Sequence, residues 1–457
     1  MACVALAAVV GCQSAGGGQG DRMDAALDAA AGDALSDVAP DCEVTVSTRQ
    51  VSSKIVTVGV VEWSLEGKAP DSAKIVYRLQ NAADGLVNLG GEAPVDLARP
   101  GYRTLLLGLK QASDYTFHIE AMRNQQLCAS PDYALPTTGT LPLSPAVSVQ
   151  VAQEAARAPG FIVTSSGTFV PSGAFIIDAD GAVVWSFPGP ESTTRALMDY
   201  EGENMWMVAL NLLNEGGQMR YVSMDGQAQD DHVAGLDYAH HDFTVMPGGK
   251  VAALAWATPG NDPPSAVVIR SPDGSVATAF TAGASVFGAD TYYHANAIHY
   301  FPSDDSFTIA DRNVNAVVKV SATGAPQWEI GGTCVGVPAG SRCLRQDWQV
   351  AHGHHLLDDG TLLLFNNGDS VNHILQYRIT DVASGFSAAV VRDYPGQGMG
   401  NNLGDVQRLP NGNTLVTYSL DGKIVELDPA WNVVQTFTVR VGYSSWRPTL
   451  YGAPARP

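Results

Sequence analysis

The sequence has no uninterrupted apolar run of the ~18 residues that a membrane-spanning helix requires. Charged residues are also scarce, at 16% of the 457 residues, whereas apolar residues make up 45%. This composition excludes a disordered chain of low hydrophobicity and leaves enough apolar material for a buried core. Basic residues are few, because 26 Lys and Arg stand against 46 Asp and Glu, for a net charge of −20. Such a chain repels nucleic-acid phosphates and anionic lipid headgroups, so neither is expected as a partner.

Turn-forming residues, by contrast, are plentiful, with 47 Gly and 26 Pro in the chain. Frequent turns favour many short strands over long helices. The length allows two or three domains. Together these features predict an acidic, β-rich protein.

The N-terminal segment carries an export signal. Residues 2–11 form a short apolar stretch, and Val9-Val10-Gly11-Cys12 resembles a bacterial lipobox, with small residues ahead of a cysteine thiol that would receive the lipid. We therefore expect a signal peptide over 1–11, a lipid on Cys12, and a flexible acidic tether over 12–41, which is rich in Gly, Ala and Asp. The expected location is the bacterial envelope, on the periplasmic side or the cell surface, with a lipid anchor as the only membrane attachment.

Cysteine usage agrees with export, because exported proteins form disulfides. Cys3 would leave with the signal and Cys12 would be lipidated. The four that remain are Cys42, Cys128, Cys334 and Cys343. Four cysteines allow three connectivities, of which the local pairing Cys42–Cys128 with Cys334–Cys343 is the simplest.

Residues 42–140 read as a small antiparallel sandwich. Segments that alternate apolar and polar residues, such as EVTVS, AKIVYRLQ and YTFHIEAM, are separated by turn residues. Trp63, Tyr77 and the spacing of Leu109 and Tyr115 resemble a fibronectin type III module, in which the tyrosine makes a corner hydrogen bond. No residue pattern in this stretch indicates chemistry, so we expect a spacer or docking module.

Residues 158–457 contain internal repeats. One series has four copies, which are HDFTVMPGG from His241, HANAIHYFP from His294, HGHHLLDDG from His352 and GDVQRLPNG from Gly404, at spacings of 53, 58 and 52 residues. A second series, offset from the first along the chain, has six copies of a strand, a tight turn and a strand, which begin at Ile176, Tyr221, Val267, Val317, Ile374 and Ile424. Repeats of about 40 to 50 residues with four strands each are typical of a β-propeller. The predicted fold is thus all-β, a six-bladed β-propeller preceded by the fibronectin type III-like β-sandwich.

The repeats predict where side chains meet. Equivalent positions at the start of one strand per blade converge at one end of the propeller axis, so His241, His294 and His352 are expected to point into one funnel. Arg312 lies on the next strand after the His294 segment, from which its side chain can return to the channel mouth. A planar guanidinium suits two oxygens of a tetrahedral oxyanion such as sulfate or phosphate.

The other histidines carry no such prediction. His240, His354 and His355 are neighbours within the same segments and are expected to pack or to lie at the surface. The histidines without a pattern are His232, His299 and His373. Aromatic residues that flank the histidine segments, and that would either stack an aryl ring or pack, are Tyr238, Tyr292, Tyr293 and Trp348.

Several of these segments resemble the bacterial aryl-sulfate sulfotransferases. They are HANAIHYFPSDDSFTIADRNVNAVVKV, HHDFTVMPGG, GDVQRLPNGNTLV and HGHHLLDDGTLLLFNNG, and the resemblance covers roughly residues 158–457. It implies a six-bladed propeller that moves a sulfuryl group from one phenol to another. It also implies a covalent sulfohistidine intermediate and no requirement for a soluble sulfate nucleotide or another cofactor.

The resemblance implies roles for individual residues. By motif, His352 matches the nucleophile, His294 and Arg312 match the sulfuryl-binding pair, and His241 matches the remaining active-site histidine. The short loop from Cys334 to Cys343 is similar to the family's disulfide loop before the nucleophile. The chain departs from the family at Ala351 and Gly353, where many relatives have Gln before the histidine and a polar residue after it.

The residues alone support the same chemistry. A neutral imidazole can attack sulfur, and a second histidine can protonate the leaving phenolate and later deprotonate the acceptor. The absence of a GxxxxGK[ST] loop argues against a nucleotide donor. The expected partners are therefore a phenolic sulfate ester as donor and a phenol as acceptor.

Two other functions stay open at this point. Three histidines can hold Zn or Cu, although Arg312 in the same site would oppose a cation. A noncatalytic surface lipoprotein that binds a partner or a small ligand needs no convergent histidines. A quinoprotein is less favoured because no Trp-rich repeat is visible.

Overall fold

The structure of the chain is a computed structural model. It describes residues 42–454 except 211–218, 258–264, 282–293, 333, 335–341, 347, 369–370, 383–384, 397, 399 and 401. The predicted signal peptide, tether and Cys12 therefore lie outside the described residues. None of the helices within the described part is long and apolar enough to cross a membrane.

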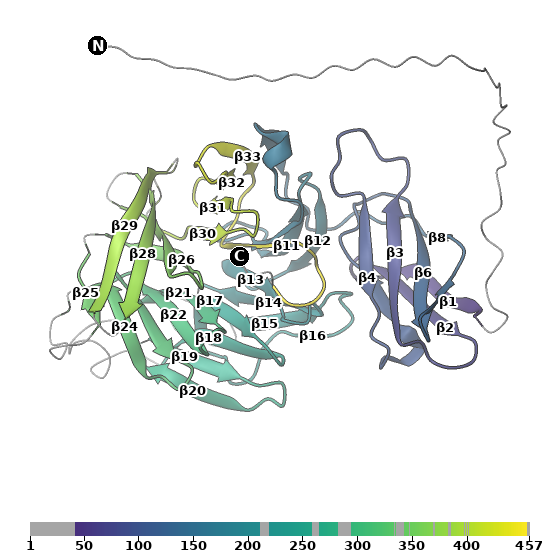
Figure 1. The fold of residues 1–457 in the computed structure, drawn as a ribbon, viewed down its shortest axis with the longest axis horizontal. Helices are drawn as coiled ribbons and strands as arrows, with labels where there is room; N and C mark the ends of the chain where they lie inside the picture. The colour runs from purple at the N-terminus through teal and green to yellow at the C-terminus, as the bar shows by residue number, and fades with distance from the viewer. Residues whose placement is uncertain are drawn as a thin grey trace, which may run out of the picture. The chain divides into compact units, whose positions relative to one another are not determined.

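The first domain is a pair of antiparallel sheets (Figure 1). One sheet has the order β1-β2-β5, and the other has the order β4-β3-β6-β7, with β8 also pairing β6. The strands are β1 (Val44–Val51), β2 (Gly59–Leu65), β3 (Ser72–Leu79), β4 (Gly90–Pro94), β5 (Thr104–Leu106), β6 (Tyr115–Arg123), β7 (Gln126–Ala129) and β8 (Tyr133–Leu135), with the short helix η1 (Pro100–Tyr102) between β4 and β5.

Alternation along these strands places the apolar side chains between the two sheets. In β6 every second residue from Tyr115 to Ala121 is buried, and Trp63 of β2 is 1% exposed. The backbone N–H of Lys110 donates a hydrogen bond to the Tyr115 hydroxyl at 2.9 Å. Cys42 and Cys128 form a disulfide within the same core.

The second domain consists of sheets of mainly antiparallel strands that follow one another along the chain (Figure 1). In the described residues there are six of them. The first contains β12 (Val183–Pro188), β11 (Gly173–Asp178), β10 (Phe161–Ser165) and β34 (Ser444–Arg447); the second contains β13 (Thr193–Met198), β14 (Asn204–Ala209), β15 (Met219–Ser223) and β16 (Gln229–Asp230). The third contains β17 (Ala239–Met246), β18 (Lys250–Trp256), β19 (Ser265–Arg270) and β20 (Val276–Thr281).

The remaining sheets have the same plan. The fourth contains β21 (Ala295–Phe301), β22 (Ser306–Asp311), β23 (Ala316–Ser321), β24 (Pro326–Gly331) and β25 (Cys343–Leu344). The fifth contains β26 (Ala351–Leu356), β27 (Thr361–Asn366), β28 (His373–Val382) and β29 (Gly385–Pro395). The sixth contains β30 (Asp405–Arg408), β31 (Thr414–Tyr418), β32 (Lys423–Leu427), β33 (Val433–Thr438) and β9 (Ser148–Val151).

Strand β9 lies ahead of the predicted domain boundary at residue 158. It pairs with β33, from Ser148 opposite Thr438 to Val151 opposite Gln435. The sixth sheet therefore takes its last strand from about ten residues before the repeats begin, and a single added edge strand carries no repeat. The short helix η2 (Glu154–Ala156) connects β9 to β10.

One strand from each sheet lies in a closed ring. Strand β34 contacts β13, and the contacts continue from β13 to β17, β21, β26 and β30, which in turn contacts β34. We call these six the inner strands. Strand β34 comes from the C-terminal end yet pairs with β10, so it completes the sheet that the beginning of the domain started. The domain is thus all-β and propeller-like, and the ring brings the starts of distant strands together.

The two disulfides make a prediction about stability. Cys42–Cys128 closes a loop with a sequence separation of 86, and Cys334–Cys343 closes one with a separation of 9. Loop-closure entropy in the unfolded chain then predicts a loss of about 4.5 kcal/mol on replacing the first pair by serine, and about 2.5 kcal/mol for the second. Urea unfolding of the two double variants measures both losses. An equal or larger loss for Cys334→Ser/Cys343→Ser would contradict the ranking.

Candidate active site

The three predicted histidines meet at one end of the ring of inner strands. His241 lies in β17 and His352 in β26, and His294 directly precedes β21, which lies between them in the ring. The Nε2 atoms of His241 and His294 are 2.9 Å apart, and their rings are nearly perpendicular. The charges of His294 and Arg312 also act on His352. The backbone N–H of Arg312 donates to the His294 carbonyl at 3.1 Å, which ties the arginine to this cluster.

Bulges in the inner strands aim these side chains. The pairing of an inner strand with its neighbour shifts between Thr193 and Arg195, Ala239 and Phe243, Ala295 and Ala297, and Ala351 and His354. A bulge breaks the strict alternation of side chains and turns one of them in a new direction. His241 has a φ of 56°, a left-handed conformation that costs a non-glycine residue energy and recurs at functional sites.

His352 is held by a network of amides. It is 3% exposed, and its Nδ1 lies 3.0 Å from the Val350 carbonyl and 2.6 Å from Nδ2 of Asn367. Asn367 is itself oriented, since its Oδ1 accepts from Asn372 at 2.8 Å and its Nδ2 donates to the Leu403 carbonyl at 3.1 Å. Burial lowers the pKa of His352 to about 3, so the imidazole is neutral at physiological pH.

His240 extends the cluster inward. Its Nδ1 lies 2.8 Å from Nδ1 of His241, and its ring stacks on Trp256 with centroids 3.9 Å apart. Because His241 contacts His294 through the opposite nitrogen, the three imidazoles form a continuous hydrogen-bonded chain. Burial lowers the pKa of His240 and His241 well below the ordinary value. His240 is thus more than the packing or surface residue expected from the sequence.

Arg312 has an unusual environment for a basic side chain. Its Nε is buried with no hydrogen-bond partner, and no ion pair among the described residues joins it to a carboxylate. The adjacent Asp311 is 2% exposed and accepts backbone N–H groups of Asn313 and Val314. Burial raises the pKa of Asp311 to about 7. The guanidinium is therefore available to an anion rather than neutralised by a neighbour.

A buried ion cluster lies below the histidines, within the ring. Arg195 of β13 donates from Nε to Asp242 Oδ1 at 2.6 Å, from Nη2 to Asp242 Oδ2 at 3.2 Å, and from Nη1 to Asp405 Oδ2 at 2.7 Å. Its guanidinium lies 4.4 Å from the centre of the Tyr443 ring. Burial alone would lower the pKa of Arg195, but Asp242 and Asp405 hold it above its usual value. We call Arg195, Asp242 and Asp405 the ion plug.

The ion plug explains one departure from the family pattern. The backbone N–H of Gly353 donates to the Gly404 carbonyl at 3.0 Å. A Cβ atom on Gly353 would lie 2.6 Å from Asp405 Cα and 2.7 Å from the Gly404 carbonyl oxygen. No side chain fits between His352 and β30 without moving the ion plug, so glycine at this position follows from the close approach of two inner strands.

The aromatic residues that flank the histidine segments, and His354, lie in different surroundings where the structure describes them. Trp348 is buried and donates from Nε1 to the Asn315 carbonyl, and Tyr238 is 36% exposed. Tyr292 and Tyr293 lie outside the described residues. His354 is fully buried, with its Nε2 2.8 Å from Thr308 Oγ1.

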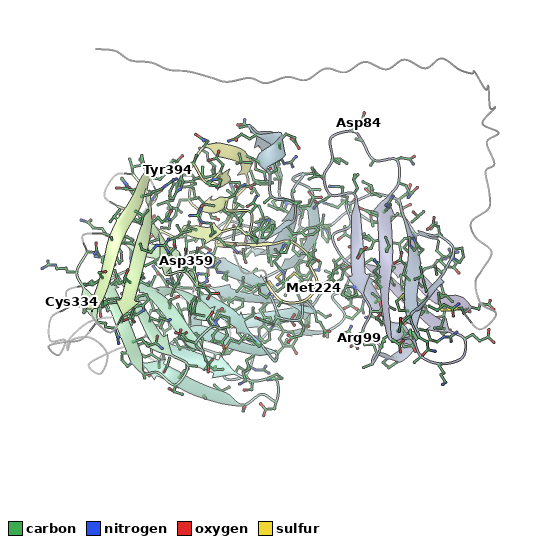
Figure 2. All side chains as sticks on the ribbon, in the orientation of Figure 1. Asp84, Arg99, Met224, Cys334, Asp359 and Tyr394 are labelled. Atoms are coloured by element: carbon green, nitrogen blue, oxygen red, sulfur yellow. A yellow bond between two sulfur atoms is a disulfide. The ribbon has the colours of Figure 1, made fainter. Side chains whose placement is uncertain are left out.

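Cys334 and Cys343 form the second disulfide, beside β25 (Figure 2 labels Cys334). In the part of the chain that the structure describes, Glu329 and these two cysteines are the one group of potential metal ligands whose atoms gather closely. Their sulfur atoms are joined in the disulfide, so they offer no thiolates. His241, His294 and His352 do not form such a group of potential metal ligands. His241 and His294 each use one ring nitrogen in the hydrogen bond between them.

The buried histidines make stability depend on pH. Burial lowers the pKa of His354 to about 3, against about 6.5 in the unfolded chain. Between these values the unfolded state binds the proton and the folded state does not, so the free energy of unfolding rises with pH. From pH 4.5 to 6.5 this residue alone contributes a rise of about 2–3 kcal/mol.

His354→Gln should therefore make this rise shallower by that amount, as measured by urea unfolding across the pH range. The comparison with the variant is required because burial raises the pKa of Asp405 to about 6, which acts in the opposite direction. His232→Gln replaces an exposed histidine and is the matched control for the substitution itself. Equal slopes in wild type and His354→Gln would show that His354 titrates normally.

Comparison with known proteins supports the motifs. The family model Arylsulfotransferase (ASST) matches residues 262–390, a segment that contains His294, Arg312 and His352 but not His241. No curated protein matches the chain.

Solved structures give only distant likenesses. A periplasmic gluconolactonase from Pseudomonas aeruginosa is 16% identical over 63% of this chain and 98% of its own, with a TM-score of 0.40. A virginiamycin B lyase from Staphylococcus aureus is 14% identical over 64% and 88%, with a TM-score of 0.39. A Bacteroides caccae protein of unknown function is 13% identical over 62% and 94%, with a TM-score of 0.40. Likenesses at this level carry no argument, whereas the family match confirms the resemblance to the arylsulfotransferases that the sequence motifs indicate.

Proposed function

We propose that the protein is a nucleotide-independent aryl-sulfate sulfotransferase, which moves a sulfuryl group from a phenolic sulfate ester to a phenol through a sulfohistidine at His352. The observation that carries the proposal is the convergence of one neutral, oriented imidazole and one arginine without a carboxylate partner at the same end of the ring. The family match over residues 262–390 supports the reaction class. The finer description of the fold belongs to the same proposal: the six sheets are the blades of a propeller, and the first domain is fibronectin type III-like.

His352 can present the correct nitrogen to sulfur. When its Nδ1–H donates to the Val350 carbonyl, Nε2 keeps a free lone pair. Asn367 then donates its two amide protons to the Leu403 carbonyl at 3.1 Å and the Val350 carbonyl at 3.3 Å. Nδ2 of Asn367 also lies 2.6 Å from Nδ1, and both atoms would be donors in this tautomer, so the network fixes the orientation of the ring but not its tautomer. A neutral imidazole is the nucleophilic form, and the low pKa keeps His352 in it.

The transfer then has two steps. In the first, Nε2 of His352 forms a bond to sulfur, the bond from sulfur to the aryl oxygen breaks, and the electron pair leaves on that oxygen, which takes a proton. In the second, the acceptor hydroxyl gives up its proton while its oxygen bonds to sulfur, and the nitrogen–sulfur bond breaks. Arg312 and His294 would hold the sulfuryl oxygens, whose charge is redistributed during both steps.

His241 is the proposed acid and base. Burial and the neighbouring imidazoles lower the pKa of His241, so it is neutral at physiological pH. A bound sulfate ester brings negative charge next to it, and an opposite charge raises the pKa of an imidazole. His240 contacts the other nitrogen of His241, so it acts as a positioning residue that holds the ring and its tautomer.

The direct test is the loss of the nucleophile. His352→Asn should abolish both donor cleavage and transfer to a phenol, since no covalent intermediate forms, and His373→Asn on β28 is the matched control. Arg312→Leu should lower the rate about a hundredfold, equivalent to about 3 kcal/mol of transition-state stabilisation. Both are measured with an aryl sulfate whose phenol is coloured. Normal turnover in His352→Asn would refute the mechanism, and an inactive wild-type protein would favour a noncatalytic binding propeller.

The acid–base role of His241 predicts a dependence on the leaving group. His241→Asn should slow esters of weakly acidic phenols much more than esters of strongly acidic phenols, because a stable phenolate needs little protonation. The measurement is the logarithm of kcat/KM against the pKa of the leaving phenol, for wild type and variant. His240→Phe should increase the dependence of kcat/KM on the leaving group by a smaller amount. It should also shift the pH profile of kcat/KM, because His240 contacts His241. A uniform loss for all esters in His241→Asn would assign it to binding alone.

We also propose that the protein is exported and held in the bacterial envelope by a lipid on Cys12. The lipobox-like Val9-Val10-Gly11-Cys12 and the two disulfides support this. Fractionation of cells that express Cys12→Ala tests it, since the variant should leave the membrane fraction, and an unchanged distribution would contradict the anchor.

A further inference from the structure

A cavity of about 170 Å³ lies within the ring on the opposite side of the ion plug from the histidines. Its walls come from the later parts of the inner strands, among them 243–245 of β17, 298–301 of β21 and 355–356 of β26. His241 and His352 stand two or more positions earlier on the same strands, and His294 directly precedes β21. A strand advances about 3.3 Å per residue. Arg195 and Asp405 line the cavity, whereas none of the three histidines nor Arg312 does.

The ion plug therefore lies between the histidine cluster and the cavity. Arg195, Asp242 and Asp405 are each at most 3% exposed, and their mutual hydrogen bonds span three inner strands. Asp242 also accepts the backbone N–H of Ile298 at 3.0 Å, which adds β21 to the same layer. A ligand in the cavity would touch the far face of this layer and not the atoms proposed to transfer the sulfuryl group.

The walls of the cavity are mainly apolar and aromatic. Phe243, Ile298, Phe301 and Leu356 line it. Apolar cavities of about 150 Å³ bind a single benzene ring, so the volume suits one aromatic ring with a small substituent. Flat rings on such walls also gain from contact with neighbouring aromatic side chains.

One polar group in this wall lacks a partner. His299 lines the cavity, and its Nε2 is buried without a hydrogen bond within the described residues. A buried polar atom without a partner costs free energy, which a ligand that supplies one recovers. A hydroxyl both donates and accepts, so it can satisfy Nε2 in either tautomer of the ring.

The charges around the cavity select against anions. Asp242 and Asp405 outweigh the positive charge of Arg195, and the cavity lining holds two carboxylates, those of Asp405 and Asp358. Burial lowers the pKa of His299 well below its ordinary value, so it supplies no positive charge at neutral pH. An aryl sulfate or a benzoate would meet net negative charge here, whereas a neutral ring would not.

We propose that this cavity is a second binding site, for a neutral single-ring phenol, separate from the sulfuryl-transfer site. The inference does not require the proposed reaction, because it rests on the shape, the unpartnered His299 nitrogen and the charges of the cavity. If the chain is a sulfotransferase, the site provides a place where free phenol binds without competing for His352.

Binding of 4-fluorophenol to the full chain, followed by fluorine NMR, tests the proposal. Ser445→Phe places a ring in the cavity, since Ser445 lines it and is only partly buried. The variant should abolish a saturable binding event that persists in Arg312→Leu. His299→Leu should weaken this event about two- to tenfold, the usual effect of one lost neutral hydrogen bond, with His373→Leu as the matched control. Fluorobenzene should bind more weakly than 4-fluorophenol, and 4-fluorobenzoate should not bind at neutral pH.

The outcomes are distinct from those for the reaction. Binding that disappears in Arg312→Leu but survives in Ser445→Phe would place the phenol at the transfer site and overturn the proposal. Absence of saturable binding in the wild type would overturn it as well, whether or not the protein transfers sulfuryl groups. Melting temperatures show whether each variant is folded, and if Ser445→Phe is not, an undiminished affinity in a folded His299→Leu variant would count against the site.

Discussion

The charge of Arg195, buried at the centre of the ring, is the constraint on which the rest of the second domain depends. Its guanidinium joins β13 to β17 through Asp242 and to β30 through Asp405. Removal of one partner from a buried ion pair costs about 3–5 kcal/mol, because the other charge stays buried without compensation. The ion plug also explains why a glycine follows His352, and it lies between the histidine cluster and the cavity.

Burial near this centre determines the protonation state of the histidines. Burial lowers the pKa of His240, His241 and His352, and each imidazole lowers that of its neighbour further. At neutral pH the site therefore holds neutral rings at His240, His241 and His352 beside the guanidinium of Arg312. A neutral nucleophile and a cationic side chain that binds an anion are therefore present at the same pH. A bound anion then raises the pKa of a neighbouring histidine, which can act as an acid.

The repeats predict more of this site than of its surroundings. His241, His294 and His352 share a position in the repeats, and the ring brings them together with Arg312 as that position indicates. Asp242 and Asp405 also share a position, directly after His241 and Gly404, which is a sequence signal for the ion plug that the histidines obscure. Arg195 and Asn367 have no such signal, because their partners come from other strands and depend on the bulges. Strand β9 pairs with β33, which lies almost a whole domain later in the sequence, and no local sequence pattern indicates this pairing.

The central claim is that His352 carries the sulfuryl group between donor and acceptor. Incubation of the protein with an aryl sulfate alone, followed by rapid denaturation and peptide mass spectrometry, tests it most directly. The account predicts the mass of one sulfuryl group on the peptide that contains His352, lost when a phenol is added before denaturation and absent in His352→Asn. The same adduct on a peptide without His352, or donor cleavage with no adduct at any time, would contradict it.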